Sequence, residues 1–238
     1  MTKIVSRDAW LEARRELLAK EKAFNTARDA LTRERQGLPW VAVETPYRFR
    51  NVTGDKSLSD LFGDCSQLVV YHFMYHPDWG DEACKSCSFW ADNFNGIEAH
   101  LKARDVAFVA ISRASVEQIE AYRKRMGWGF EWLSSLGTSF NDDFGVGFDD
   151  AAREANKISY NYRTQNFVAS ELPGVSVFAR DADGRVCHTY STYSRGLDML
   201  NGAYHFLDLV PRGRDEAALS WPQAWIRRRD EYETDANG

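Results

Sequence analysis

The N-terminal segment carries a helical pattern of apolar and polar positions. Four large apolar residues recur every seven positions: Trp10, Leu17, Phe24 and Leu31. Ser6 is a favourable N-cap and Gly37 interrupts the pattern, so the spacing predicts one helix over residues 6–36. Because the helix has a single apolar stripe, we expect it to pack against its own domain. Homodimerisation through the stripe is the alternative.

After residue 39 the pattern changes to short apolar runs that alternate with helical segments. Strands are expected at residues 40–43, 47–49, 68–75 and 105–112. A helical turn is expected at 57–62, and helices at 88–104 and 115–126. From the strand at 68–75 onward the order is strand, helix, strand, helix, which implies a parallel sheet with right-handed crossovers.

The C-terminal half begins with a polar, aromatic and glycine-containing stretch, residues 141–171, which shows no stable period and is interpreted as an insertion. A β-hairpin follows, with strands at 174–178 and 185–193 around a run of turn residues, and then a closing helix at 194–209. The predicted organisation is a helical extension (1–39), an α/β domain (40–210) and a polar tail (211–238).

The charge and hydropathy of the chain argue against two classes of partner, nucleic acids and membranes. The formal net charge is −5, which argues against a nucleic-acid partner because such proteins carry a basic excess. The basic run Arg227-Arg228-Arg229 is flanked by acidic residues and is expected to be a solvated helix face. No run is long and apolar enough to cross a membrane and no signal peptide is evident, so we expect a cytoplasmic protein without a membrane partner.

The motif Cys84-Lys85-Ser86-Cys87 carries the clearest chemistry of the sequence. It follows the apolar strand at 68–75 and precedes a helical pattern, and a CxxC in that setting is typical of redox-active thiols. Unsatisfied N–H groups at a helix N-terminus stabilise a thiolate and lower its pKa. We therefore expect Cys84 to attack and Cys87 to resolve, in a chain whose four cysteines are kept reduced in the cytosol.

Two other roles for the motif stay open. A structural zinc site needs four ligands, yet Cys65 and Cys187 are isolated and only Cys187 has an adjacent ligand, His188, so no metal is expected. Buried, unreactive thiols are the second alternative. A dithiol carries its own two electrons, so no cofactor is expected. His72 and His76 are proton-relay candidates, although the sequence favours packed histidines there.

Several segments of the chain resemble known families. Residues 72–74, 84–92 and 188–196 resemble the DUF899 group of bacterial thioredoxin-like proteins. Residues 75–79 and 130–146 are similar to the peroxiredoxin-like branch of the thioredoxin fold. The resemblance covers residues 40–210 and implies a thioredoxin-like three-layer α/β/α sandwich with a central mixed sheet.

The thioredoxin-like resemblance also implies a substrate site. Cys84 and Cys87 correspond to the nucleophilic and resolving cysteines of that fold. Pro173 falls where the fold places a cis-proline opposite the thiols. The backbone beside such a proline, including Gly174, is expected to pair with an extended substrate.

Three further residues are candidates for substrate contact. Trp79 is a candidate rim residue of the site, with a core position as the alternative. Tyr190 and Arg195 belong to a run in which polar and aromatic groups alternate, and they are candidates to bind an anionic or peptide partner. An exposed strand face is the alternative for that run.

Together these features predict a thiol-disulfide oxidoreductase that acts on a protein or small-molecule disulfide. A thiol peroxidase that reduces a peroxide is the first alternative. It is weakened because Asp81 stands where the peroxiredoxin pattern has a threonine. The second alternative is a non-catalytic thioredoxin-fold binding module.

Overall fold

A computed structural model describes residues 3–155, 157–165 and 169–232. The chain divides into two compact units, Met1–Trp40 and Val41–Gly238. None of the described helices is both long and apolar enough to span a bilayer.

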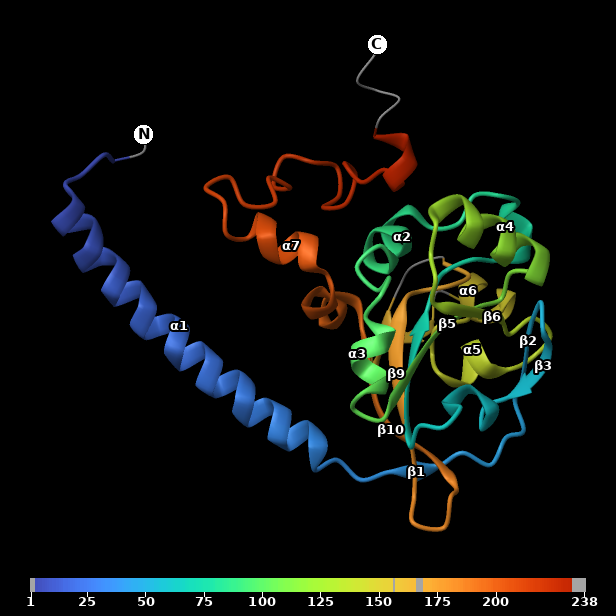
Figure 1. The fold of residues 1–238 in the computed structure, drawn as a ribbon. Coiled ribbons are helices and arrows are strands. Elements are labelled where there is room, and N and C mark those ends of the chain that lie inside the picture. The colour runs from blue at the N-terminus through green and yellow to red at the C-terminus, as the bar shows by residue number, and fades with distance from the viewer. Residues whose placement is uncertain (1–2, 156, 166–168, 233–238) are drawn as a thin grey trace. The chain divides into compact units, whose positions relative to one another are not determined.

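The first unit is one long helix, α1 (Arg7–Gln36), drawn in blue in Figure 1. The Ser6 hydroxyl accepts a hydrogen bond from the Ala9 N–H (3.3 Å), and the Gly37 N–H donates to the Arg33 carbonyl (3.1 Å). The predicted helix and both of its ends are therefore confirmed. No residue of α1 is buried, so packing or dimerisation through its apolar stripe stays a prediction.

The second unit is built on a mixed sheet. Its strands are β1 (Val41–Ala42), β2 (Arg48–Asn51), β3 (Gly54–Ser57), β4 (Gln67–His72), β5 (Val106–Ser112), β6 (Glu131–Ser134), β9 (Gly174–Arg180) and β10 (Val186–Tyr193). They lie in the order β1-β10-β9-β4-β5-β6-β2-β3. The central strand β4 pairs in parallel with β5 and antiparallel with β9, and β9 forms a hairpin with β10.

Helices cover both faces of this sheet (Figure 1). The aromatic core on one face joins the sheet to α2 (Lys85–Ala91), α3 (Glu98–Lys102), α4 (Val116–Met126) and α7 (Gly202–Leu207). The opposite face is covered by the 3-10 helix η1 (Asp60–Phe62) and by α5 (Phe140–Asp143).

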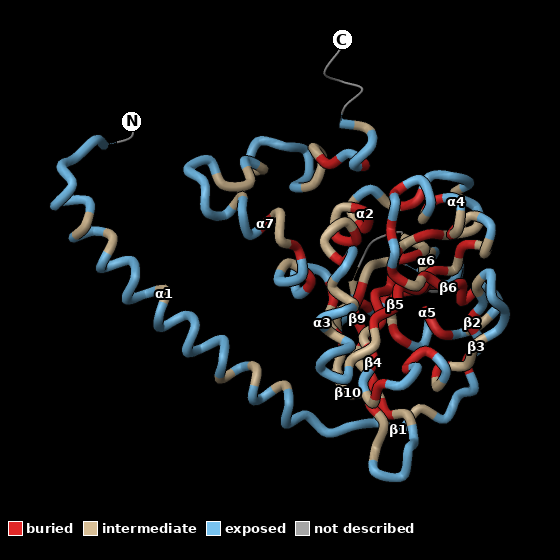
Figure 2. The backbone as a smooth tube through the Cα atoms, viewed as in Figure 1, coloured by how far each residue is buried: buried red, intermediate tan, exposed pale blue. Residues whose placement is uncertain are grey.

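Strand β4 separates the two cores because successive side chains of a strand point to opposite faces. Leu68 and Val70 enter the core beneath η1 and α5, whereas Tyr71 and Phe73 enter the aromatic core. Figure 2 shows the buried residues gathered along this sheet. The architecture is the expected thioredoxin-like three-layer sandwich.

Two predicted helices are interrupted. The segment 88–104 contains α2 and α3 instead of one helix, and between them Gly96 adopts φ 89°, which a right-handed helix excludes. The segment 194–209 is the 3-10 helix η3 (Ser194–Leu200) followed by α7. The break lies at Asn201, whose side chain caps α7 by accepting from the Tyr204 N–H (3.1 Å).

Other regions contain helices and strands that the sequence pattern did not predict. The stretch 141–171 contains the rest of α5, α6 (Asp150–Glu154) and a separate ribbon of β7 (Ile158–Tyr160) and β8 (Arg163–Gln165). The expected helical turn at 57–62 begins only at Asp60, because Gly54–Ser57 pairs with β2 as a strand. The 3-10 helices η2 (Pro77–Trp79) and η4 (Arg229–Glu231) complete the unit.

Candidate thiol site

The chain places Cys84 at the N-cap of α2, in the loop that leaves β4. The Cys84 sulfur accepts a hydrogen bond from the Cys87 backbone N–H (3.3 Å). The Cys84 N–H donates to the Met74 carbonyl (3.3 Å), and its carbonyl accepts from the Ser88 N–H (3.0 Å). These bonds fix the half-buried thiol at the junction of strand and helix.

Cys87 lies one helical turn further on and is only 2% exposed. Its sulfur accepts from the Met74 backbone N–H (3.5 Å), and its carbonyl accepts from the Tyr71 hydroxyl (3.4 Å). Burial raises the pKa of Cys87 well above its ordinary value. A hydrogen bond with Cys87 lowers the pKa of Cys84. The pair therefore combines a Cys84 thiol whose pKa is lowered with a Cys87 thiol whose pKa is raised.

Both cysteines line a cavity of about 480 Å³. Most of its other lining residues are aromatic or aliphatic: Tyr71, Met74, Trp90, Tyr160, Leu172, Pro173, Leu197 and Trp221. The polar remainder is Ser86, Gln165, Ser194, Arg195, Asp198 and Gln223. The composition is that of a small-molecule site, with an apolar wall and few polar groups.

Tyr160, from β7 of the unpredicted ribbon, organises one wall of the cavity. Its hydroxyl donates to the Pro173 carbonyl (2.7 Å) and accepts from the Ser194 N–H (2.9 Å). This bridge holds β9 and η3 on the side of the thiols. No described peptide bond is cis, so the bond that precedes Pro173 is trans, which differs from the cis-proline that the thioredoxin-like resemblance implies at this position.

The structure brings some of the candidate residues together and leaves others outside. Pro173 and Arg195 line the cavity with the two cysteines. Trp79 packs against the aromatic core at the end of η2. Gly174 is buried in the β-ladder opposite His72 and Tyr193. Tyr190 lies on β10, where it pairs with Val177 of β9. Trp79, Gly174 and Tyr190 are not among the residues that line the cavity.

Arg228 is a site residue that the sequence did not reveal. It is 3% exposed, so the expected solvated helix face is wrong at this position. Its guanidinium donates to the Ala83 carbonyl (2.9 Å) and the Tyr122 hydroxyl (2.8 Å) and forms an ion pair with Glu82. Its positive charge contributes to the lowered pKa of Cys84.

A chain of hydrogen bonds connects Arg228, through the Tyr122 and Ser88 hydroxyls, to the backbone of Cys84. The Tyr122 hydroxyl lies 2.8 Å from the Ser88 hydroxyl, which donates to the Cys84 carbonyl (2.9 Å). The only sequence signal for this arrangement was a set of apolar residues in the supposedly polar tail: Trp221, Trp225 and Ile226. Ile226 is buried and Trp225 packs on the aromatic core.

The other two cysteines and His72 lie outside the lining of this cavity. Cys65 and Cys187 are buried and neither lines the cavity of Cys84. His72 is buried with its Nε2 2.8 Å from the Ser176 hydroxyl, which confirms a packed histidine. Within the described part of the chain, no group of three or more His, Cys, Asp or Glu residues is arranged to hold a metal ion.

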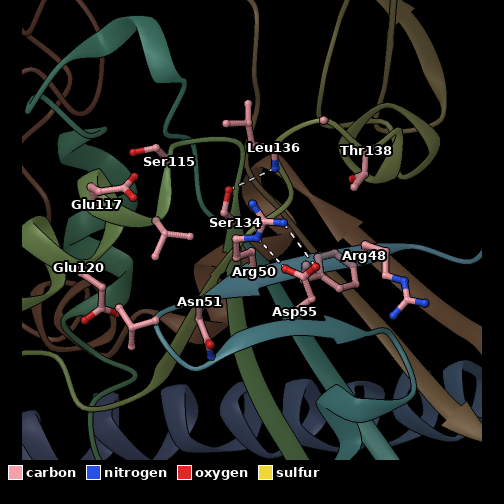
Figure 3. Close-up of a pocket in the computed structure, with 14 residues that line it drawn as sticks. Arg48, Arg50, Asn51, Asp55, Ser115, Glu117, Glu120, Ser134, Leu136 and Thr138 are labelled. Atoms are coloured by element: carbon pink, nitrogen blue, oxygen red, sulfur yellow. Dashed lines mark hydrogen bonds and ion pairs between the residues drawn. The ribbon is translucent and has the colours of Figure 1, made fainter.

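A second cavity, of about 620 Å³, lies between β2 and the start of α4 (Figure 3). Its lining is polar and charged, and the Arg50 guanidinium is paired with Asp55 (2.6 Å). Glu117 and Glu120 line its other side. Cysteine and histidine are absent from its described lining, so the cavity of Cys84 is the better candidate for chemistry.

This chain belongs to the DUF899 family, described as "Bacterial protein of unknown function (DUF899)", whose model matches residues 1–232. The resemblance noted in the sequence is thereby confirmed. No curated protein matches the chain.

Solved structures that are similar to this chain include proteins named as a PrxQ, a peroxidoxin and a peroxiredoxin. A PrxQ variant of Xylella fastidiosa is 14% identical, with a TM-score of 0.42, and the match covers 69% of this chain and 91% of that one. Peroxidoxin BcpB from Mycobacterium tuberculosis is 15% identical, with a TM-score of 0.44 and coverage of 68% and 92%. The mitochondrial 2-Cys peroxiredoxin from Plasmodium falciparum is 15% identical, with a TM-score of 0.41 and coverage of 69% and 92%.

Proposed function

We propose that this protein is a thiol-disulfide oxidoreductase in which Cys84 attacks and Cys87 resolves. The observation that carries the proposal is the asymmetry of the two thiols at one cavity. Cys84 is half-buried with a lowered pKa, whereas Cys87 is buried with a raised pKa. A thiolate is the reactive form of cysteine, so this arrangement supports Cys84 as the residue that takes the first step.

The reaction follows from these roles. The Cys84 thiolate attacks one sulfur of a substrate disulfide, the substrate S–S bond breaks, and the leaving sulfur takes up a proton from solvent. Cys87 then loses its proton and attacks the Cys84 sulfur, which releases the second substrate thiol. Two electrons pass from the protein dithiol to the substrate, and the protein is left with a Cys84–Cys87 disulfide.

All four cysteines are free thiols in the structure. We place the protein in the cytoplasm, where thiols are kept reduced and a disulfide is transient. A cytoplasmic dithiol pool would return the oxidised pair to the reduced state by the reverse exchange.

A glutathione redox titration tests the proposal, with the remaining thiols alkylated and the disulfide located by mass spectrometry. We expect a reversible Cys84–Cys87 disulfide within the range of about −120 to −270 mV spanned by thiol oxidoreductases. Cys84→Ser should abolish it. Cys187→Ser, which alters a buried cysteine outside the cavity, is the matched control and should leave it unchanged.

The titration also has an outcome that would reject the proposal. If Cys84 and Cys87 both stay alkylatable, or both stay unreactive, at every glutathione ratio, the oxidoreductase proposal is rejected. A non-catalytic binding module then becomes the better description of the fold.

Thiol peroxidase is the second candidate, because a half-buried thiolate beside a cavity is within reach of a peroxide. In that reaction the Cys84 thiolate attacks one peroxide oxygen, the O–O bond breaks, and the other oxygen takes up a proton and leaves as water or an alcohol. Cys84 becomes a sulfenic acid, and the Cys87 thiol condenses with it to form the disulfide and release water. Peroxide consumption by the reduced protein, with Cys84→Ser as the control, separates this candidate from disulfide exchange.

A further inference from the structure

We propose that the substrate of this thiol site is a low-molecular-weight disulfide with apolar or aromatic groups beside its sulfurs. We further propose that Trp221 and Gln223, from the C-terminal segment (residues 211–232), are the specificity-determining residues that exclude protein disulfides. This inference rests on the proposed function and narrows its substrate class.

The size and lining of the cavity support a small ligand. A volume of about 480 Å³ falls in the range of small-molecule pockets. Tyr71, Trp90, Leu172 and Leu197 present ring and aliphatic surface around the two thiols. A flat aromatic group next to a disulfide would bury its apolar area against these side chains.

Charge in the cavity is largely compensated. Asp198 is the acidic residue of the lining, and it forms ion pairs with Arg214 (3.0 Å) and with Arg195 (3.4 Å). Gln165 is also engaged, since its amide donates to the Tyr160 carbonyl (3.0 Å). Recognition therefore depends on apolar contact more than on a charged group of the ligand.

The backbone around Pro173 is already occupied. An extended protein substrate would bind by adding main-chain hydrogen bonds to free groups of the site. Here the Pro173 carbonyl accepts from the Tyr160 hydroxyl (2.7 Å), and the Leu172 N–H donates to the Val146 carbonyl (2.9 Å). Gly174 is paired in the sheet with His72 and Tyr193.

The C-terminal segment supplies the remaining wall. Trp221 and Gln223 line the cavity directly. The segment is held on one side by Glu216, which accepts from the Trp225 ring N–H (2.7 Å) and the Tyr204 hydroxyl (2.9 Å). Trp221 itself is 51% exposed, so its truncation would open the cavity without emptying the core.

Single-turnover kinetics test the inference. The reduced full-length protein is mixed with dipyridyl disulfide, a small aromatic probe, or with insulin, a protein disulfide. Each rate constant is divided by that of free dithiothreitol with the same disulfide, which removes intrinsic reactivity. We expect the normalised rate to favour dipyridyl disulfide by at least about tenfold, which corresponds to about 1.4 kcal/mol.

Variants assign the selectivity to the proposed wall. Trp221→Ala and Gln223→Ala should each lower the normalised preference, Trp221→Ala by about fivefold or more, with a faster reaction toward insulin. Phe206→Ala removes an aromatic ring that is 74% exposed and lies outside the cavity, so it should leave the preference unchanged.

The outcomes separate the two proposals. Equal normalised rates for both disulfides, or an unchanged preference in Trp221→Ala, would overturn the substrate class while disulfide exchange itself still stands. Failure to react with either disulfide, together with no Cys84–Cys87 disulfide in the glutathione titration, would reject the oxidoreductase function and the substrate class with it.

Discussion

Among single residues, the neighbouring Cys87 contributes most to the lowered pKa of Cys84, and a residue that lies far away in the sequence, Arg228, adds to it. Arg228 is separated from Cys84 by more than half of the chain, yet it contacts the carbonyl of the preceding residue, Ala83 (2.9 Å). A buried cation beside a thiol favours the thiolate form. Arg228 therefore acts through Cys84 as a positioning and electrostatic residue.

Replacing Arg228 should raise the pKa of Cys84. In Arg228→Gln the pH profile of Cys84 alkylation is expected to shift to higher pH, so the rate at neutral pH falls. Arg228→Lys retains the charge and should recover part of the shift, which a purely structural role would not explain. Arg227→Gln changes an exposed neighbour and serves as the control. An identical profile in Arg228→Gln and the wild type would contradict the electrostatic role.

His72 should make the folded state sensitive to acid. Burial lowers its pKa from 6.5 to about 3, so the unfolded chain binds a proton below pH 6.5 that the folded chain refuses until about pH 3. The free energy of unfolding should therefore decrease as the pH drops from 6.5 to about 3, by up to about 1.4 kcal/mol per pH unit from this group. Urea denaturation at several pH values measures the slope.

The matched variants for that measurement are His72→Gln and His205→Gln. His72→Gln should flatten the slope between pH 6.5 and about 3, because the titrating imidazole is gone. His205 is exposed, so its replacement should leave the slope unchanged. A wild-type slope that persists in His72→Gln would assign the acid sensitivity to other groups.

At the scale of elements, the parts with a strong local pattern were predictable. The strands β4 and β5 and the hairpin of β9 and β10 have continuous or alternating apolar runs. They were found close to their predicted positions, although β4 ends at His72 and not at residue 75. The short ribbon of β7 and β8 was not, because strands of three residues contain too few alternations to show a period. The same ribbon supplies Tyr160, so the wall it builds was missed with it.

The residues of the thiol site also divide into those that could be predicted from the sequence and those that could not. Cys84 and Cys87 were identified because their chemistry is local, in one strand-to-helix junction. Trp221, Gln223 and Arg228 were missed because they reach the site through tertiary contacts. The apolar residues of their segment indicate that it packs somewhere, but the local sequence does not show against which part of the fold. The trans bond before Pro173 was likewise not readable from the sequence.

The bridge made by Tyr160 should be measurable as stability. Tyr160→Phe leaves the Pro173 carbonyl and the Ser194 N–H without their partner, which is expected to cost about 1–3 kcal/mol of unfolding free energy. Tyr162→Phe removes a hydroxyl that donates to the Ser191 carbonyl from a residue that is 76% exposed. Water can replace that bond, so the control should cost less. Equal costs would show that the bridge has no special role.

At the scale of the whole molecule, one cavity is assembled from segments that are distant along the chain. Tyr71 and Cys84 come from the first half of the α/β unit, Pro173 directly precedes β9, and Trp221 comes from the C-terminal segment. The site is complete only when the C-terminal segment has folded onto α2 and α4. The long helix α1 belongs to a separate unit.

Two truncations should therefore differ sharply. Removal of residues 1–40 is expected to leave the pH profile of Cys84 alkylation unchanged, because the unit that contains the thiols begins at Val41. A chain that ends at Pro211 loses the buried Ile226 and Arg228. Its unfolding free energy should fall by at least about 2 kcal/mol, from the loss of buried apolar area alone.

The chain that ends at Pro211 should also alter the thiols themselves. Without Arg228 the pKa of Cys84 is expected to rise, and without Trp221 the thiols should become more accessible to large alkylating reagents. Comparing a small and a bulky maleimide at one pH measures accessibility, while the pH profile measures the charge effect. If the C-terminal truncation changed neither quantity and the N-terminal truncation changed both, the thiol site would depend on α1 instead of the C-terminal segment.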